Sequence, residues 1–325
     1  MLISQIFDPN KKIQFENLAL QVFRHQSVTC STYGNYLYQL GINPKSINYF
    51  DQIPFLPIQF FKSQKIISTN KKIDKVFLSS GTTEKVQSKH YVSDLNIYKQ
   101  SYLTGFEKFY GNIKDYTILA LLPSYLERNG SSLIFMVDDL IKKSKSIDSG
   151  FYLNDLESLS NKLILLNERN QKVLLIGVSY ALLDLVNKYK FHLKNTIVME
   201  TGGMKGRRKE MIREELHQLL SKGFGVDKIH SEYGMTELLS QAYSKGNGIF
   251  ERPPWMRVLV RDPEDPLSIL AHSKTGGLNI VDLANINSCS FIATQDLGKT
   301  NANGAFEILG RFDNSDIRGC NLMVF

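Results

Sequence analysis

Apolar and polar residues alternate in blocks over the first two thirds of the chain, and these blocks predict strands and helices in turn. Short apolar runs of strand character lie at 75–78, 117–122, 172–177, 195–200 and 227–232. Helix-like apolar spacing covers 13–25, 29–40, 93–109, 155–170, 180–190 and a stretch that ends at 222, with Gly41 as an expected stop and Ser93 as an expected N-cap. Strands that alternate with helices are typical of an α/β fold, a mostly parallel sheet covered by helices.

The pattern changes from Trp255 onward. Short strand-like runs lie at 256–261, 267–272, 277–283, 290–294 and 305–309. Turn sequences such as Asp262-Pro263 and Asn303-Gly304 separate them. We therefore expect two domains, an α/β lobe over 1–250 and a compact antiparallel or barrel-like subdomain over 251–325.

Composition narrows the class of protein. The chain has 325 residues, of which 42% are hydrophobic, as in an ordinary globular protein with ample core. The longest apolar runs, such as 118–122, are far short of a membrane span, and the first residues lack the pattern of a secretion signal. Three cysteines, Cys30, Cys289 and Cys320, show no metal-type spacing. Free thiols of this kind fit a reducing cytoplasm, so we expect a cytoplasmic protein.

The chain is basic, with a formal net charge of +7 that is concentrated partly in 62–89 and 205–209. A basic protein can bind nucleic acid. The sequence has, however, no zinc-finger spacing, no RNA-recognition signature and no homeodomain-like element. A phosphate-rich small substrate or an acidic carrier protein accounts for the charge equally well, so we expect no nucleic-acid partner.

Candidate chemistry begins at Ser79-Ser80-Gly81-Thr82-Thr83, which follows the strand-like run 75–78 and precedes Glu84-Lys85. Successive backbone N–H groups and hydroxyls at the end of a strand form an anion-binding concavity, so the stretch is a candidate phosphate cradle. It is not a Walker loop, because that motif ends in Gly-Lys followed by Ser or Thr. A hydroxyl-rich turn that caps the next helix is the alternative.

A second stretch, Tyr233-Gly234-Met235-Thr236-Glu237, lies about 150 residues downstream. Together the two stretches resemble the signatures of the adenylate-forming ligase superfamily, and within it the chain is most similar to the LuxE-type acyl-protein synthetases. The resemblance covers nearly the whole length and includes 53–57, 123–128, 130–133 and 310–320. It implies the fold of the superfamily's N-terminal lobe and activation of a carboxylic acid with ATP, which yields an acyl-AMP and pyrophosphate.

The resemblance also implies roles at the nucleotide site. Tyr233 would stack on adenine, Thr236 would contact the phosphates and Glu237 would bind Mg²⁺, for which a hard carboxylate oxygen is suitable. Without the resemblance, Glu237 would be an ordinary acid at a helix start. The other cofactor-binding residues implied are Ser79, Ser80, Gly81, Thr82, Thr83 and Lys85 for the phosphates, Gly202 and Gly203 beside adenine, Gly234 in the second motif, Asp296 for the ribose hydroxyls and Arg311 for the nucleotide.

Several positions depart from the superfamily pattern. Glu84 and Gln295 stand where many relatives have glycine. In full-length ligases of the superfamily, a small C-terminal domain carries the lysine that stabilises adenylation. The resemblance to LuxE-type proteins implies that this domain is absent. We expect another cation to replace this lysine, and Lys205, which follows the Gly202-Gly203 turn, is the candidate. A solvated lysine and a plain tight turn are the alternatives there.

The acyl acceptor implied by the resemblance is Cys320, because LuxE-type synthetases use a cysteine close to the C-terminus. A small buried residue in a final strand is the alternative. The sequence thus predicts an AMP-forming ligase that uses ATP and Mg²⁺ to transfer a fatty or aromatic acid to a protein thiol. We expect an acyl reductase or an acyl carrier protein as partner. Transfer to CoA or a carrier thiol, and a non-catalytic nucleotide-binding subunit of a reductase complex, stay open.

Overall fold

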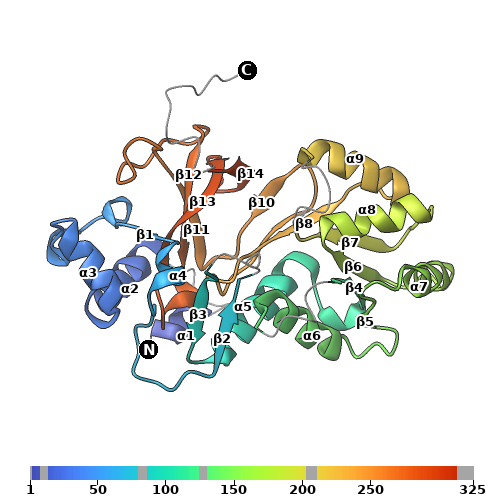
Figure 1. The fold of residues 1–325 in the computed structure, drawn as a ribbon, viewed down its shortest axis with the longest axis horizontal. Helices are drawn as coiled ribbons and strands as arrows, with labels where there is room; N and C mark the ends of the chain where they lie inside the picture. Colours follow the sequence, from blue (N-terminus) through green and yellow to red (C-terminus); the bar gives the residue numbers. More distant parts are fainter. Residues whose placement is uncertain (1, 8–13, 80–85, 124–129, 203–210, 313–325) are drawn as a thin grey trace.

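The computed structural model describes residues 2–7, 14–79, 86–123, 130–202 and 211–312. One mixed sheet of twelve strands crosses this part of the chain (Figure 1). Its strand order is β11-β12-β13-β14-β10-β9-β8-β7-β6-β4-β5, and β1 pairs with β13. A separate sheet consists of β2 and β3. The α/β fold expected from the sequence is thereby confirmed.

Parallel strands form one half of the large sheet. They are β4 (Thr117–Leu121), β5 (Gly150–Phe151), β6 (Val173–Gly177), β7 (Thr196–Glu200) and β8 (His230–Tyr233). Every residue of β4 and β6 is buried, because helices cover both faces of this half. The helices are α5 (Leu95–Tyr110), α6 (Ser132–Ser144), α7 (Leu156–Glu168), α8 (Ser179–Lys188) and α9 (Arg213–Phe224). In Figure 1, α8 and α9 lie above these strands and α5 and α6 below.

Antiparallel strands form the other half. They are β9 (Ala242–Ser244), β10 (Ile249–Glu251), β11 (Met256–Arg261), β12 (Gly276–Asp282), β13 (Phe291–Thr300) and β14 (Phe306–Arg311). The expected domain boundary between 250 and 251 lies inside β10, which pairs with both β9 and β14. The hydrogen-bonded sheet is thus continuous at this position, and the division into two domains stays a prediction.

The N-terminal segment packs against the antiparallel half. Its elements are α1 (Leu2–Ile6), α2 (Phe15–Thr29), α3 (Ser31–Gln39), two short 3₁₀ turns (Pro44–Ser46 and Phe50–Gln52), β1 (Leu56–Pro57) and α4 (Phe60–Ser63). β1 pairs in parallel with β13, and the rings of Phe23, Tyr33 and Phe55 lie 6.0–6.2 Å from that of Phe291. The aromatic residues around Pro54 and Pro57 therefore contribute to the core.

Two local predictions are wrong. The N-cap of α5 is Asp94 rather than Ser93, because the Asp94 carboxylate accepts a hydrogen bond of 3.0 Å from the Asn96 backbone N–H. The run 267–272 forms only an isolated bridge between Ile269 and Arg261. The other predicted strands and helices are present with shifted ends. No helix in the described part of the chain is long and apolar enough to cross a membrane.

Candidate active site

The carboxyl ends of β7 and β8 bring two of the predicted motifs to one edge of the sheet. The strands are neighbours, with Glu200 opposite Ser231. Gly202 follows β7 and the loop Gly234–Glu237 follows β8. This edge of a parallel sheet is where α/β proteins bind ligands, so the two stretches are placed where the sequence predicted.

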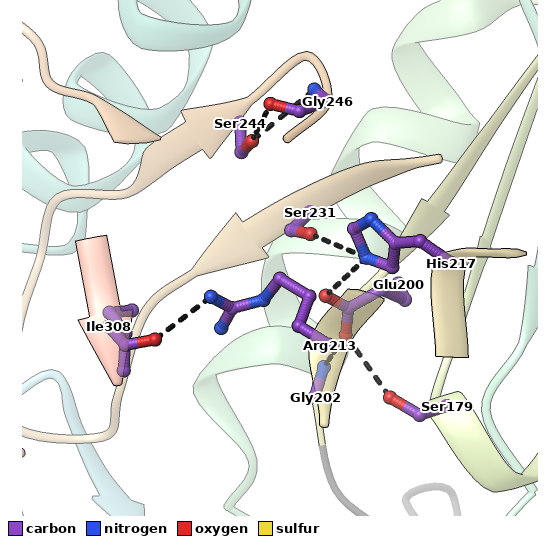
Figure 2. Close-up of polar contacts among 9 residues, drawn as sticks. All are labelled: Ser179, Glu200, Gly202, Arg213, His217, Ser231, Ser244, Gly246 and Ile308. Carbon is purple, nitrogen blue, oxygen red and sulfur yellow. Dashed lines mark hydrogen bonds and ion pairs between the residues drawn. The ribbon is translucent and has the colours of Figure 1, made fainter. Parts of the chain in front are cut away.

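Gly202 lies in a turn that the Glu200 side chain holds. Its φ of +73° is in the left-handed region that glycine adopts readily, and among the described residues other than its chain neighbours no atom lies within 4 Å of the position where a Cβ would be. The Glu200 carboxylate accepts hydrogen bonds from the Gly202 N–H at 2.5 Å and from the Ser179 hydroxyl at 3.1 Å (Figure 2). Thr201 Oγ1 has no hydrogen-bond partner among the described residues. The turn therefore combines open space with an unpaired hydroxyl, and it suits a flat polar ligand.

Glu200 carries a buried negative charge that its neighbours compensate. Burial raises the pKa of its carboxyl group, but hydrogen bonds from His217, Ser231 and Gly202 outweigh burial, so the pKa is lowered overall. His217 Nε2 lies 3.6 Å from Glu200 Oε1. Arg213, which also lowers this pKa, donates a hydrogen bond of 3.0 Å to the Ile308 carbonyl (Figure 2). The network connects the Gly202 turn with β14.

Asp296 contacts both Tyr233 and Arg311, although three different strands carry these residues. The Tyr233 hydroxyl donates a hydrogen bond of 2.7 Å to Asp296 Oδ2, and Arg311 Nε lies 3.1 Å from Asp296 Oδ1. Tyr233 and Asp296 are buried, while the Arg311 side chain is 74% exposed. The antiparallel pairing of β13 with β14 places Asp296 opposite Arg311. A buried carboxylate with an exposed cation beside it is chemically suited to hydroxyl groups and phosphates.

Gly234 is required by close packing rather than by its backbone angles. A Cβ at this position would lie 2.5 Å from Oε1 of Glu232. Glu232 is buried, and burial, together with the charge of Glu200, raises the pKa of its carboxyl group to about 8. The carboxyl group of Glu232 is therefore mostly neutral at pH 7.

Glu237 is buried at the end of the same loop. Burial raises the pKa of its carboxyl group, and a hydrogen bond from the Ser88 side chain lowers it in part, as do the charges of Arg311 and Lys62. Its backbone carbonyl accepts a hydrogen bond of 2.8 Å from the Asn285 side chain. The carboxylate is thus held close to two cationic groups.

Ser79 lies at the end of the first strand of a β-hairpin. β2 (Lys75–Leu78) pairs antiparallel with β3 (Lys89–Val92). The Ser79 N–H donates to the Ser88 carbonyl at 3.1 Å, and the Ser88 N–H donates to Ser79 Oγ at 2.9 Å. The chain therefore enters a strand after this loop rather than the helix that the alternative interpretation required. Through Ser88, the base of the hairpin loop adjoins Glu237.

The remaining predicted residues lie outside the described part of the chain. They are Ser80, Gly81, Thr82, Thr83, Lys85, Gly203, Lys205 and Cys320. Their roles stay predictions.

The described residues offer one carboxylate, that of Glu237, as a possible ligand for a magnesium ion bound with a nucleotide. Among them, no group of three or more His, Cys, Asp or Glu side chains could hold a metal ion. Mg²⁺ in phosphate-binding sites usually takes one or two carboxylates, with waters and substrate phosphates as its other ligands. Glu237 is the carboxylate that the loop offers.

Polar residues that the sequence did not reveal bind the backbone of the segment after β8. Asp282 accepts hydrogen bonds from the Leu239 and Ser240 N–H groups, both at 2.9 Å. His90 contacts the Thr236 carbonyl at 2.9 Å. Each is a single buried polar residue in a strand. Nothing in the local sequence separates such a residue from an ordinary core position.

Solved structures share this architecture. An ATP-bound MatB from Rhodopseudomonas palustris superposes with a TM-score of 0.54 at 18% identity, covering 75% of this chain and 49% of MatB. A 2-hydroxyisobutyryl-CoA ligase in complex with 2-HIB-AMP and CoA superposes with a TM-score of 0.63 at 11% identity, covering 92% of this chain and 70% of the ligase. A McyG A-PCP structure with phenylalanyl-adenylate superposes with a TM-score of 0.53 at 15% identity, covering 88% of this chain and 54% of the McyG chain.

The class of fold follows from these likenesses: it is that of the N-terminal lobe of adenylate-forming ligases. The chain spans about half the length of MatB. Curated proteins provide no match. A sequence model of the family described as "Acyl-protein synthetase, LuxE" matches residues 4–325. The chain belongs to this LuxE acyl-protein synthetase family.

Proposed function

We propose that the protein activates a carboxylic acid with ATP and transfers the acyl group to a protein thiol. In the first step, a carboxylate oxygen of the acid attacks the α-phosphorus of ATP. The bond from that phosphorus to the bridging oxygen breaks, and pyrophosphate leaves. In the second step, a thiolate attacks the acyl carbon, and AMP leaves.

One observation supports this proposal most directly. Tyr233, Asp296 and Arg311 are distant in sequence and converge on the sheet edge that also carries Thr236 and Glu237. The ring of Tyr233 suits a nucleotide base, the carboxylate of Asp296 suits the ribose hydroxyls, and the cation of Arg311 suits a phosphate. Family membership supports the same reaction.

Each described residue has a distinct task in this proposal. Asp296 accepts hydrogen bonds from the ribose hydroxyls, oriented by the phenol of Tyr233. Gly202 leaves room for the adenine face, and the Glu200 network keeps its turn in place. Mg²⁺, when bound through Glu237, supplies positive charge against the triphosphate. Arg311, which is mostly exposed and paired with Asp296, would contact the nucleotide.

The acceptor and the acid belong to the proposal as well. Cys320 is the proposed acceptor thiol, since it matches the position of the family's acceptor cysteine. A fatty or aromatic acid is the proposed substrate, and an acyl reductase or an acyl carrier protein is the proposed partner. Transfer to CoA or to a carrier's pantetheine thiol is the competing outcome.

Exchange of labelled pyrophosphate into ATP tests the first step. Purified protein with Mg²⁺ and a panel of fatty and aromatic acids should exchange the label. Glu237→Ala should reduce exchange about 10²-fold or more, because one lost charge-stabilising contact typically has that effect. Glu251→Ala, on the exposed surface of β10, is the matched control. ATP binding without exchange under every acid would favour the non-catalytic subunit, and full activity of Glu237→Ala would remove its metal role.

A further inference from the structure

Two buried polar side chains of the β2–β3 hairpin face the loop that follows β8. Ser88 and His90 are two residues apart in extended chain, so their side chains lie on one face of the hairpin. The Ser88 side chain is close enough to the Glu237 carboxyl group to lower its pKa. His90 Nδ1 lies 2.9 Å from the Thr236 carbonyl oxygen, and its Nε2 lies 3.0 Å from Ser288 Oγ. The hairpin therefore contacts two successive residues of the loop.

The tautomer of His90 follows from its partners. A carbonyl oxygen only accepts hydrogen bonds, so Nδ1 carries the proton and donates to Thr236. The ring is fully buried, and burial lowers its pKa to about 4, so it is neutral at pH 7. Nε2 is then an acceptor, and the Ser288 hydroxyl donates to it. The ring of Phe61 packs edge-on against the imidazole at 5.7 Å.

These contacts define the orientation of Glu237. Its side-chain direction depends on the peptide planes on either side. His90 holds the carbonyl before Glu237, and Asn285 holds the carbonyl of Glu237 itself. The Ser88 side chain adjoins the carboxyl group and lowers its pKa. A metal-binding carboxylate must be placed to within about 0.5 Å, which requires partners of this kind.

We propose that Ser88 and His90 are positioning residues that hold Thr236 and Glu237 in the geometry needed for binding magnesium-ATP. They act through the loop and do not contact the nucleotide. Ser88 is also hydrogen-bonded to Ser79 at the end of β2, so it connects that strand end to the proposed metal carboxylate. This inference rests on the proposed function.

Two amide substitutions at position 90 separate positioning from packing. Asparagine places its amide nitrogen near the position of Nδ1 and can still donate to Thr236. Glutamine places its amide nitrogen near the position of Nε2 and leaves the Thr236 carbonyl without that donor. Removing partners of metal ligands typically weakens metal affinity 10–100-fold. Calorimetry with a non-hydrolysable ATP analogue gives the Mg²⁺ concentration at which binding is half-saturated. This concentration should rise at least about 10-fold more in His90→Gln than in His90→Asn.

Each outcome of this experiment decides something. If wild type does not bind the analogue with Mg²⁺, the proposed function itself fails. If wild type binds and the two variants show the same Mg²⁺ dependence, His90 is a packing residue and the positioning role is overturned. Should His90→Gln not fold, Ser88→Ala decides, since it leaves the buried ring in place. An unchanged Mg²⁺ dependence in Ser88→Ala would then overturn the inference.

Discussion

Replacing Glu232 by glutamine should change how the stability of the protein depends on pH. Glu232 is only 9% exposed, and burial, with the nearby charge of Glu200, raises the pKa of its carboxyl group from 4.5 to about 8. In the unfolded chain the carboxyl group titrates near its ordinary value. Between pH 4.5 and 8 the native state therefore binds one proton that the unfolded state has lost, and stability falls as pH rises.

The magnitude follows from the two pKa values. One pKa unit corresponds to about 1.4 kcal/mol, so the carboxyl group destabilises the native state by about 3 kcal/mol at pH 7 and about 5 kcal/mol above pH 8. Glutamine is neutral at every pH. The variant should therefore gain stability relative to wild type by about 1.4 kcal/mol per pH unit up to pH 8 and keep a constant advantage above it.

Urea unfolding from pH 6 to pH 9.5 measures this difference. Glu251→Gln, at an exposed position of β10, controls for the loss of a negative charge and should follow the wild-type curve. Parallel curves for Glu232→Gln and wild type over this range would refute the reasoning. They would mean that the native structure accepts an ionised carboxylate next to Gly234.

Two further predictions concern the nucleotide and the acyl group. Tyr233→Phe keeps the ring but removes its hydrogen bond to Asp296, so unfolding free energy should fall by about 1.5–3 kcal/mol and ATP affinity should fall too. Unchanged ATP affinity by calorimetry would contradict the role given to Asp296. Cys320→Ser should keep pyrophosphate exchange but lose the label from radioactive acid that neutral hydroxylamine releases from the protein. If this variant is labelled as well as wild type, the acceptor is another thiol, and the CoA or carrier alternative becomes the better proposal.

The sequence by itself determined the parallel half of the sheet. Runs such as Val173–Gly177 are apolar throughout because helices cover both faces, and helices with regular apolar spacing separate them. The Tyr233–Glu237 motif was also visible, since it is contiguous and its position after a strand predicts a ligand-binding edge. The Asp296 and Arg311 assignments rested on resemblance alone.

Only the tertiary structure decided which of these segments meet. A local pattern encodes which side of a strand is buried but not which distant strand lies beside it. Tyr233 reaches Asp296 across 63 residues, and His90 reaches Thr236 across 146, because the β8, β13 and hairpin segments are brought together by sheet pairing and core packing. The single buried polar residues that hold the loop have no local signature, since their partners exist only in the folded chain.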